Sequence, residues 1–170
     1  MKELFKKAIP YSLQDIILKR VVTLTEEDKR NALLYKNIKA DEALLERVNL
    51  KVSKHDTMHY GNGAHYLSVG LSAINCILKA IEDAKVKPIS KILDMPCGFG
   101  RVLRFLKIVF PDATITGCDV NKGGVDFCAK KLHSIPHYST DNLQKLSLPE
   151  KYDLIWCGSL VTHFFNKSIN

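Results

Sequence analysis

From Ile89 onwards, short apolar runs alternate with longer segments in which apolar residues recur at helical spacing. The segments of strand length are the apolar run Ile89–Met95, followed by Ala113–Cys118, the short Ile135–Tyr138 and Tyr152–Cys157. Helical spacing occurs between them, at Gly100–Phe110 and Asn121–Leu132. Strands that alternate with helices need crossover connections, so this pattern predicts an α/β fold with a mostly parallel sheet.

The first 88 residues carry a different pattern, which we interpret as helical throughout. Thr25 followed by three acidic residues predicts a helix start, because acidic side chains stabilise the positive end of the helix dipole. Other helices are expected from Ser12 onwards, at Asp41–Val48 and at His65–Asp83, with a polar loop at His55–Gly63. We therefore divide the chain into an N-terminal helical region, residues 1–60, and an α/β region, residues 61–170.

The composition is that of an ordinary globular protein, with 46% hydrophobic and 25% charged residues. No apolar run reaches the roughly 20 residues that span a bilayer, so we expect no membrane partner. The five cysteines are an odd number without a C-x-x-C pair, which favours reduced thiols and a cytoplasmic protein. The net charge of +7 is spread along the chain, so nucleic acid is not an expected partner.

A strand, a glycine loop and a helix follow one another in Lys91–Arg101 and beyond. Gly98 and Gly100 allow the backbone to turn sharply and to approach a ligand, and the free N–H groups of the next helix face that ligand. Asp119 ends the second strand 21 residues after Gly98, where an acid accepts hydrogen bonds from ribose hydroxyls. Leu103 stands where a dinucleotide site needs glycine, and no Gly-Lys-Ser/Thr follows. The pattern therefore indicates a ribose-bearing ligand without pyrophosphate.

Three segments resemble motifs of the class I S-adenosylmethionine-dependent methyltransferases. Leu93–Arg101 resembles motif I, Thr116–Asp119 resembles motif II, and Lys151–Gly158 resembles motif IV with its strand. They follow the order of the family, and Pro96 marks a D-x-P-C-G-x-G variant of motif I. The resemblance implies a Rossmann-like, doubly wound sheet of strand order 3-2-1-4-5-7-6 and S-adenosylmethionine as the cofactor.

The resemblance also implies a role for each motif residue. Asp94 would anchor the methionine amino group, directly or through water. Asp119 would bind the ribose hydroxyls with Val120 against the adenine, and Asp141 or Asn142 would face the adenine amino group. The loop along the methionine and the ribose would be formed by Pro96, Cys97, Gly98 and Gly100. The methyl end of the cofactor would be lined by Trp156, Cys157 and Gly158.

For several residues outside the motifs, more than one role is possible from the sequence. Tyr60 or Tyr66 would close over the sulfonium or donate to the carboxylate, or else belong to a connector that packs on the sheet. Arg101 would contact the cofactor carboxylate or an N-terminal acid, whereas Arg104 is expected at the solvated surface. His163 would be a general base for a substrate hydroxyl, or else a residue at a helix entry.

The leading hypothesis is a methyltransferase for a small-molecule or sugar-type acceptor. The alternatives are a non-catalytic cofactor-binding or interaction module and a nicotinamide-dependent oxidoreductase, against which Leu103 argues. Only 13 residues follow Cys157, too few for strands five to seven of the family sheet. We therefore expect a truncated chain, a degraded species or a chain completed by a partner. The exposed edge of the fourth strand would permit a homodimer.

Overall fold

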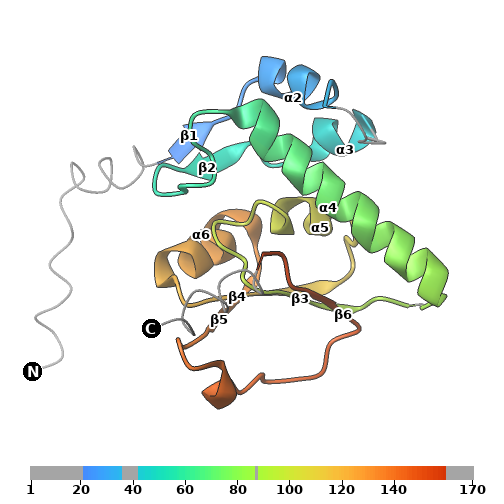
Figure 1. The fold of residues 1–170 in the computed structure, drawn as a ribbon, viewed down its shortest axis with the longest axis vertical. Helices are drawn as coiled ribbons and strands as arrows, with labels where there is room; N and C mark the ends of the chain where they lie inside the picture. The colour runs from blue at the N-terminus through green and yellow to red at the C-terminus, as the bar shows by residue number, and fades with distance from the viewer. Residues whose placement is uncertain (1–20, 36–41, 87, 160–170) are drawn as a thin grey trace, which may run out of the picture.

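The computed structural model describes residues 21–35, 42–86 and 88–159, and its centre is a four-stranded parallel sheet (Figure 1). The strands are β3 (Lys91–Asp94), β4 (Thr114–Asp119), β5 (Ile135–Tyr138) and β6 (Leu154–Trp156). Their order across the sheet is β5-β4-β3-β6, and each neighbouring pair is parallel. Counted along the chain from β3, this order is third, second, first and fourth, and the predicted parallel sheet is confirmed.

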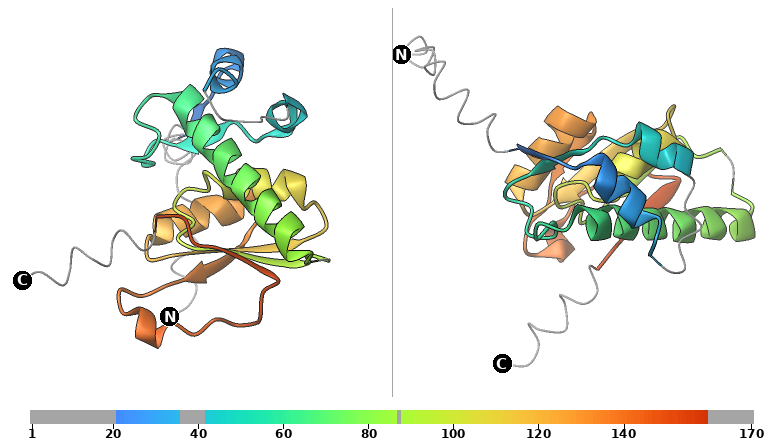
Figure 2. Two further views of the ribbon diagram at one scale, coloured as in Figure 1. Left: turned by 45° about the vertical axis from the view of Figure 1, so that its right-hand side comes forward. Right: turned by 90° about the horizontal axis from the view of Figure 1, so that it is seen from above.

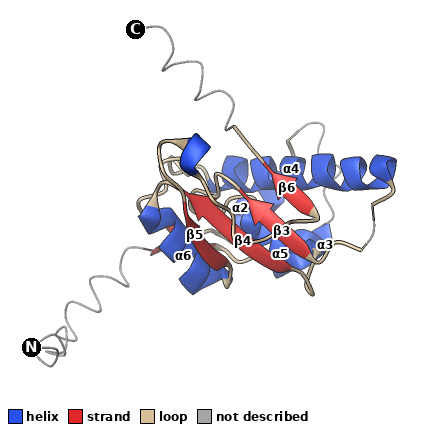
Figure 3. Ribbon diagram, turned by 90° about the horizontal axis from the view of Figure 1, so that it is seen from below, coloured by secondary structure: helices blue, strands red, loops and turns tan. Residues whose placement is uncertain are grey.

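The two faces of the sheet are covered differently (Figures 2 and 3). The helices α4 (Gly63–Ala84), α5 (Leu103–Val109) and α6 (Lys122–Leu132) lie on one face. The segment that contains the short 3-10 helix η1 (Leu143–Lys145) crosses the other face. The side chains alternate accordingly: Ile92 packs under the helices, and Leu93 packs against the second face.

The N-terminal region is not helical throughout. It contains a two-stranded antiparallel sheet of β1 (Val21–Thr23) and β2 (Lys51–Ser53), beside the helices α2 (Glu26–Ala32) and α3 (Glu42–Arg47). The prediction was wrong at these strands because each has three residues, too few to show a strand period, and they pair across almost thirty residues of sequence. The helix expected from Ser12 lies largely outside the described residues.

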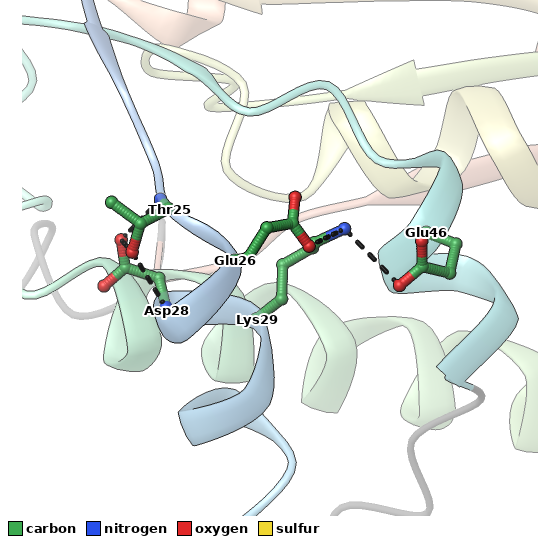
Figure 4. A network of polar contacts seen from close by, with 5 residues as sticks. All are labelled: Thr25, Glu26, Asp28, Lys29 and Glu46. Atoms are coloured by element: carbon green, nitrogen blue, oxygen red, sulfur yellow. Dashed lines mark hydrogen bonds and ion pairs between the residues drawn. The ribbon is translucent and has the colours of Figure 1, made fainter.

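The start of α2 is held by reciprocal hydrogen bonds, as the Thr25 pattern predicts. The Asp28 backbone N–H donates to Thr25 Oγ1 over 3.1 Å, and the Thr25 N–H donates to Asp28 Oδ2 over 2.8 Å. One turn further on, Lys29 lies between Glu26 at 2.7 Å and Glu46 at 3.4 Å (Figure 4). This cation therefore links α2 to α3.

The helix α4 is longer at both ends than the predicted His65–Asp83, and Asn62 caps it through the His65 N–H. Among the described residues, α4 is the one helix long and apolar enough to cross a membrane by length and composition, a property that no unbroken apolar run had indicated. A helix buried in a protein core satisfies the same criteria, and one side of α4 is buried against α2 and α5.

The N-terminal region and the sheet share one hydrophobic core. Side chains from β2, α2 and α3 lie in the same buried cluster as side chains from the sheet and from α4, α5 and α6. Examples from the two parts are Leu24, Ala32, Leu45 and Val52, and Ile92, Phe105, Ile115 and Val125. The proposed boundary at residue 60 therefore does not separate two cores.

Candidate functional site

The loop after β3 lies at the carboxyl edge of the sheet, between β4 and β6. Backbone pairing continues past the end of β3, because the Met95 N–H donates to the Trp156 carbonyl and the Cys97 N–H to the Cys118 carbonyl, both over 2.9 Å. Parallel strands end at the same edge, so Asp94 and Asp119 both reach this loop.

Gly98 and Gly100 both have positive φ, +50° and +79°, which a residue with a Cβ adopts only under strain. They differ in their surroundings. A Cβ on Gly98 would meet nothing within 4 Å, whereas a Cβ on Gly100 would lie 2.3 Å from Leu132 Cδ1 on α6. The loop therefore presents Gly98 to open space and packs Gly100 against a helix.

Asp119 joins this loop to the start of α6. Its Oδ2 accepts the Gly98 N–H over 2.7 Å, and its Oδ1 accepts the Asn121 N–H over 2.8 Å. Asn121 in turn caps α6, since its side chain accepts the Gly124 N–H over 3.2 Å. The sequence predicted that Asp119 binds the ribose, and it did not predict that Asp119 also holds the loop and the start of α6. Both uses are compatible, because a carboxylate has about four lone-pair sites.

Asp94 is the buried acid of the site, with 1% of its surface exposed. Burial, and then the negative charge of Asp119, raises the pKa of its carboxyl group to about 8, against a hydrogen bond from the Leu103 backbone. Its Oδ2 has no hydrogen-bond partner among the described residues. A buried acceptor of this kind is costly unless a donor reaches it, so Asp94 is suited to receive an amino group.

Other predicted residues surround the same edge. Pro96 follows a cis peptide bond at the start of the loop, and Cys97 is buried beside it. Val120 directly follows Asp119 and is 52% exposed, so it offers apolar surface to a ligand. Trp156 ends β6 and packs partly against the core, and a Cβ on Gly158 would lie 2.7 Å from its indole nitrogen.

Asp141 and Asn142 follow β5 and are exposed, and the Asn142 side chain accepts the Gln144 N–H over 3.0 Å. Tyr60 is 84% exposed, with φ at +43°, and Arg101 lies with its guanidinium 5.9 Å from the Tyr66 ring centroid. Their roles toward a cofactor stay predictions. His163, the predicted general base, lies outside the described residues.

Tyr66 is a correction to the sequence prediction. Its side chain has no exposed surface, and its hydroxyl donates to Asp56 Oδ2 over 2.7 Å while accepting Arg104 Nη2 over 3.2 Å. Burial raises the pKa of this phenol above its ordinary value. Tyr66 is a core residue rather than a lid, because the apolar stripe of α4 that carries it faces inward.

Arg104 is the second correction, because it is 1% exposed rather than solvated. Its Nε donates to the Gly100 carbonyl over 3.0 Å, and its Nη1 donates to the carbonyls of Asn49 and Lys51 over 2.6 and 3.1 Å. The partners in the N-terminal region are more than fifty residues away in sequence, so no local pattern reveals them. Arg104 therefore connects the glycine loop to β2 and its approach.

The site fits S-adenosylmethionine by its polar and steric features. Asp94 has a free acceptor for an amino group, the space beside Gly98 is open, and Val120 is exposed next to Asp119. The described residues contain no group of three or more side chains that would bind a metal ion. Two surface hollows, one at the end of α4 and one between α3, α5 and α6, are not lined by Asp94, Gly98 or Asp119.

Comparison with known proteins finds a match to methyltransferases over the second half of the chain. Residues 92–170 match the family model described as "Methyltransferase domain". Malonyl-[acyl-carrier protein] O-methyltransferase from Acetivibrio thermocellus is 28% identical over 104 residues, which cover 58% of this chain and 36% of that protein.

Two solved structures are similar at lower identity. The plantazolicin methyltransferase BpumL in complex with SAH is 22% identical, with 85% of this chain and 49% of that chain covered and a TM-score of 0.45. The 16S rRNA methylase RmtB is 16% identical, with 94% and 58% covered and a TM-score of 0.41. The chain thus spans between about a third and three fifths of the length of these proteins.

The family match begins inside β3 and includes the glycine loop, both acids and the rest of the parallel sheet. The sequence motifs occur in the same stretch and in the order of the family. Residues 92–170 of the chain are therefore similar to a methyltransferase domain, in the same stretch that carries the sequence motifs and the parallel sheet.

Proposed function

We propose that the intact protein transfers a methyl group from S-adenosylmethionine, which binds at the carboxyl ends of β3 and β4. The observation that carries the proposal is the loop held by Asp119 through the Gly98 N–H, beside the unpartnered carboxyl oxygen of Asp94. This arrangement is formed by the chain itself, so the loop is positioned before a ligand arrives.

S-adenosylmethionine supplies a methyl group on a sulfonium, which is already activated for displacement, so the protein mainly provides position. In our proposal Asp94 holds the amino group, and the free lone pairs of Asp119 accept the ribose hydroxyls. Val120 covers the adenine, and Asp141 or Asn142 faces its amino group. A base such as His163 is needed only when the acceptor must lose a proton.

We propose a small-molecule or sugar-type acceptor. The positive charge is spread along the sequence rather than gathered in a run, which does not favour a nucleic-acid acceptor. The name of the curated relative gives a malonyl group on a carrier protein as its acceptor, which is a small group. A cytoplasmic location is also proposed, supported by five cysteines that are all free thiols.

Calorimetric titration of this chain with S-adenosylhomocysteine and with NAD tests the cofactor. We expect saturable binding of S-adenosylhomocysteine and none of NAD. Binding of NAD without S-adenosylhomocysteine would refute the proposal. Methyl transfer itself is measured on the full-length protein with a panel of hydroxyl, amine and carboxylate acceptors. Substitution of His163 by alanine should lower kcat there only for acceptors that must be deprotonated.

A further inference from the structure

A basic hollow of about 280 Å³ lies between the end of α3, the outer side of α5 and the end of α6. Its lining contains the basic residues Arg47, Arg104, Lys107, Lys131 and His133, and no carboxylate. These residues come from three separate helices and from the position that follows α6, and four of them are arginines or lysines. We call this feature the basic hollow.

The cations of the basic hollow have no acidic partner among the described residues. The ion pairs of the described residues are made by Lys29, Lys79 and Lys91, none of which lines the basic hollow. Lys107 and Lys131 are also half-buried, which limits the screening of their charges by water. Side chains of one sign that converge on a concave surface raise the local concentration of opposite charge.

Arg104 adds a buried positive charge at the wall of the hollow. Its guanidinium donates to three carbonyls and to the Tyr66 hydroxyl, and none of these acceptors is a carboxylate. Asp56 is the nearest acid in this network, and it is reached only through Tyr66. An arginine stays charged in a protein, so a buried one is stabilised by an anion nearby.

Helix ends account for part of this charge but not for all of it. Arg47, Lys107 and Lys131 each lie in the last turn of a helix, where a cation is favourable. Each helix end supplies at most about half a negative charge, and α3 and α5 have only six and seven residues. Arg104 lies in the first turn of α5, so the helix ends leave a net positive charge.

We propose that the basic hollow binds the phosphate group of a small phosphorylated molecule. Lysine and arginine side chains are the usual phosphate ligands, and Ile108 and Leu132 give an apolar wall for the organic part. The volume is close to the lower end of small-molecule sites. The basic hollow shares no lining residue with the glycine loop, although Arg104 and Leu132 also contact Gly100, and the proposal does not depend on methyl transfer.

Calorimetry at constant ionic strength tests the proposal with two probes, inorganic phosphate and glycerol 3-phosphate. The variant Arg47→Gln/Lys131→Gln removes two cations of the hollow. Its matched control is Arg30→Gln/Lys79→Gln, which removes one arginine and one lysine from exposed positions outside it. We expect saturable binding that weakens about tenfold or more in the first variant and is unchanged in the control.

Tighter binding of glycerol 3-phosphate than of inorganic phosphate would assign the hollow to a phosphate ester, and equal binding would assign it to the free anion. Equal weakening in both double variants would show a general charge effect and would overturn the proposal. The absence of saturable binding to the unsubstituted chain would also overturn it. Titration with S-adenosylhomocysteine in the same samples reports separately on the cofactor site and on folding.

Discussion

The carboxyl group of Asp94 makes folding depend on pH. Burial raises its pKa from 3.8 to about 8, so between these values the folded chain keeps a proton that the unfolded chain releases. Its contribution to the free energy of unfolding is full below pH 3.8 and is lost as the pH rises toward about 8. We predict that Asp94→Asn removes this dependence and stabilises the ligand-free chain at about pH 8 by a few kcal/mol.

Thermal unfolding of both chains between about pH 5 and pH 9 measures this effect. Asp112→Asn, at an exposed position outside the site, is the control and should follow the unsubstituted chain. Parallel pH profiles for Asp94→Asn and the unsubstituted chain would show that this carboxyl is not the titrating group. The same substitution should weaken the binding of S-adenosylhomocysteine.

Asp119 is expected to affect both stability and binding. Asp119→Ala removes the acceptors of the Gly98 and Asn121 N–H groups, which should cost about 1–3 kcal/mol of unfolding free energy. Affinity for S-adenosylhomocysteine should fall about tenfold or more, as the loop loses its anchor and the ribose its acceptor. Asp119→Asn keeps one acceptor oxygen, so its stability and its affinity should lie between those of the unsubstituted chain and those of Asp119→Ala.

Denaturant unfolding and calorimetry give the two readouts for Asp119. Asp126→Ala is the control, because Asp126 accepts a hydrogen bond from Tyr138 at an exposed position on α6. It should change stability by less than about 1 kcal/mol and leave affinity unchanged. Unaltered affinity in Asp119→Ala would mean that the ribose assignment is wrong.

At the scale of elements, α6 is packed directly on the glycine loop. A Cβ on Gly100 would meet the Leu132 side chain, and its φ of +79° is itself strained for other residues. We predict that Gly100→Ala costs about 2–4 kcal/mol, the sum of backbone strain and overpacking. Gly61→Ala has a similar φ of +71° with nothing within 4 Å, so it should cost only about 1 kcal/mol.

The difference between these two glycine variants in urea unfolding measures the contact between the loop and α6. Equal costs would show that Leu132 moves aside without penalty. Gly100→Ala should also weaken S-adenosylhomocysteine binding, since Gly98 is two residues away. Gly61→Ala should not.

Contacts between α5 and the N-terminal region centre on Arg104. Arg104→Met would leave the carbonyls of Gly100, Asn49 and Lys51 without their donor, and we predict a loss of about 3 kcal/mol or more. Arg104→Lys should restore little, because an ammonium cannot reproduce the planar fork of donors. Arg101→Met is the control for a partly exposed arginine, and chemical unfolding is the measurement. Full rescue by lysine would contradict this account.

The helices and strands that the sequence predicted are those whose formation depends on residues close together in the sequence. Thr25 and Asn121 cap helices through hydrogen bonds to residues three positions away, so their helices could be predicted from local pattern. The pairing of β1 with β2 and the burial of Arg104 depend on partners distant in sequence, and neither was predicted. At the candidate site, the spacing of Asp94, Asp119 and the two glycines predicted their roles toward a cofactor, which stay predictions, whereas the hydrogen bond from Gly98 to Asp119 required the fold.

At the scale of the molecule, the described sheet has an edge at β6. This strand pairs with β3, no other described strand lies beyond it, and its Ile155 is 52% exposed. Such an edge favours pairing with another chain. We predict a concentration-dependent dimer and a higher monomer fraction for Ile155→Lys, measured by light scattering coupled to size exclusion.

Ile135→Lys is the matched control at the opposite edge, where Ile135 on β5 is 48% exposed. It should leave the monomer fraction unchanged if β6 is the edge that pairs. An effect of Ile135→Lys alone would assign the dimer to β5. A monomer at all concentrations would exclude both edges.

The hydrogen bonds from Asp56 through Tyr66 and Arg104 to Gly100 have a consequence for protein engineering. They cross from the N-terminal region to the cofactor loop inside one core. A chimera that replaces residues 21–86 with the corresponding part of a homologue would separate the members of this chain of bonds. Recombination of this fold is therefore expected to succeed only when Asp56, Tyr66 and Arg104 are inherited from the same parent.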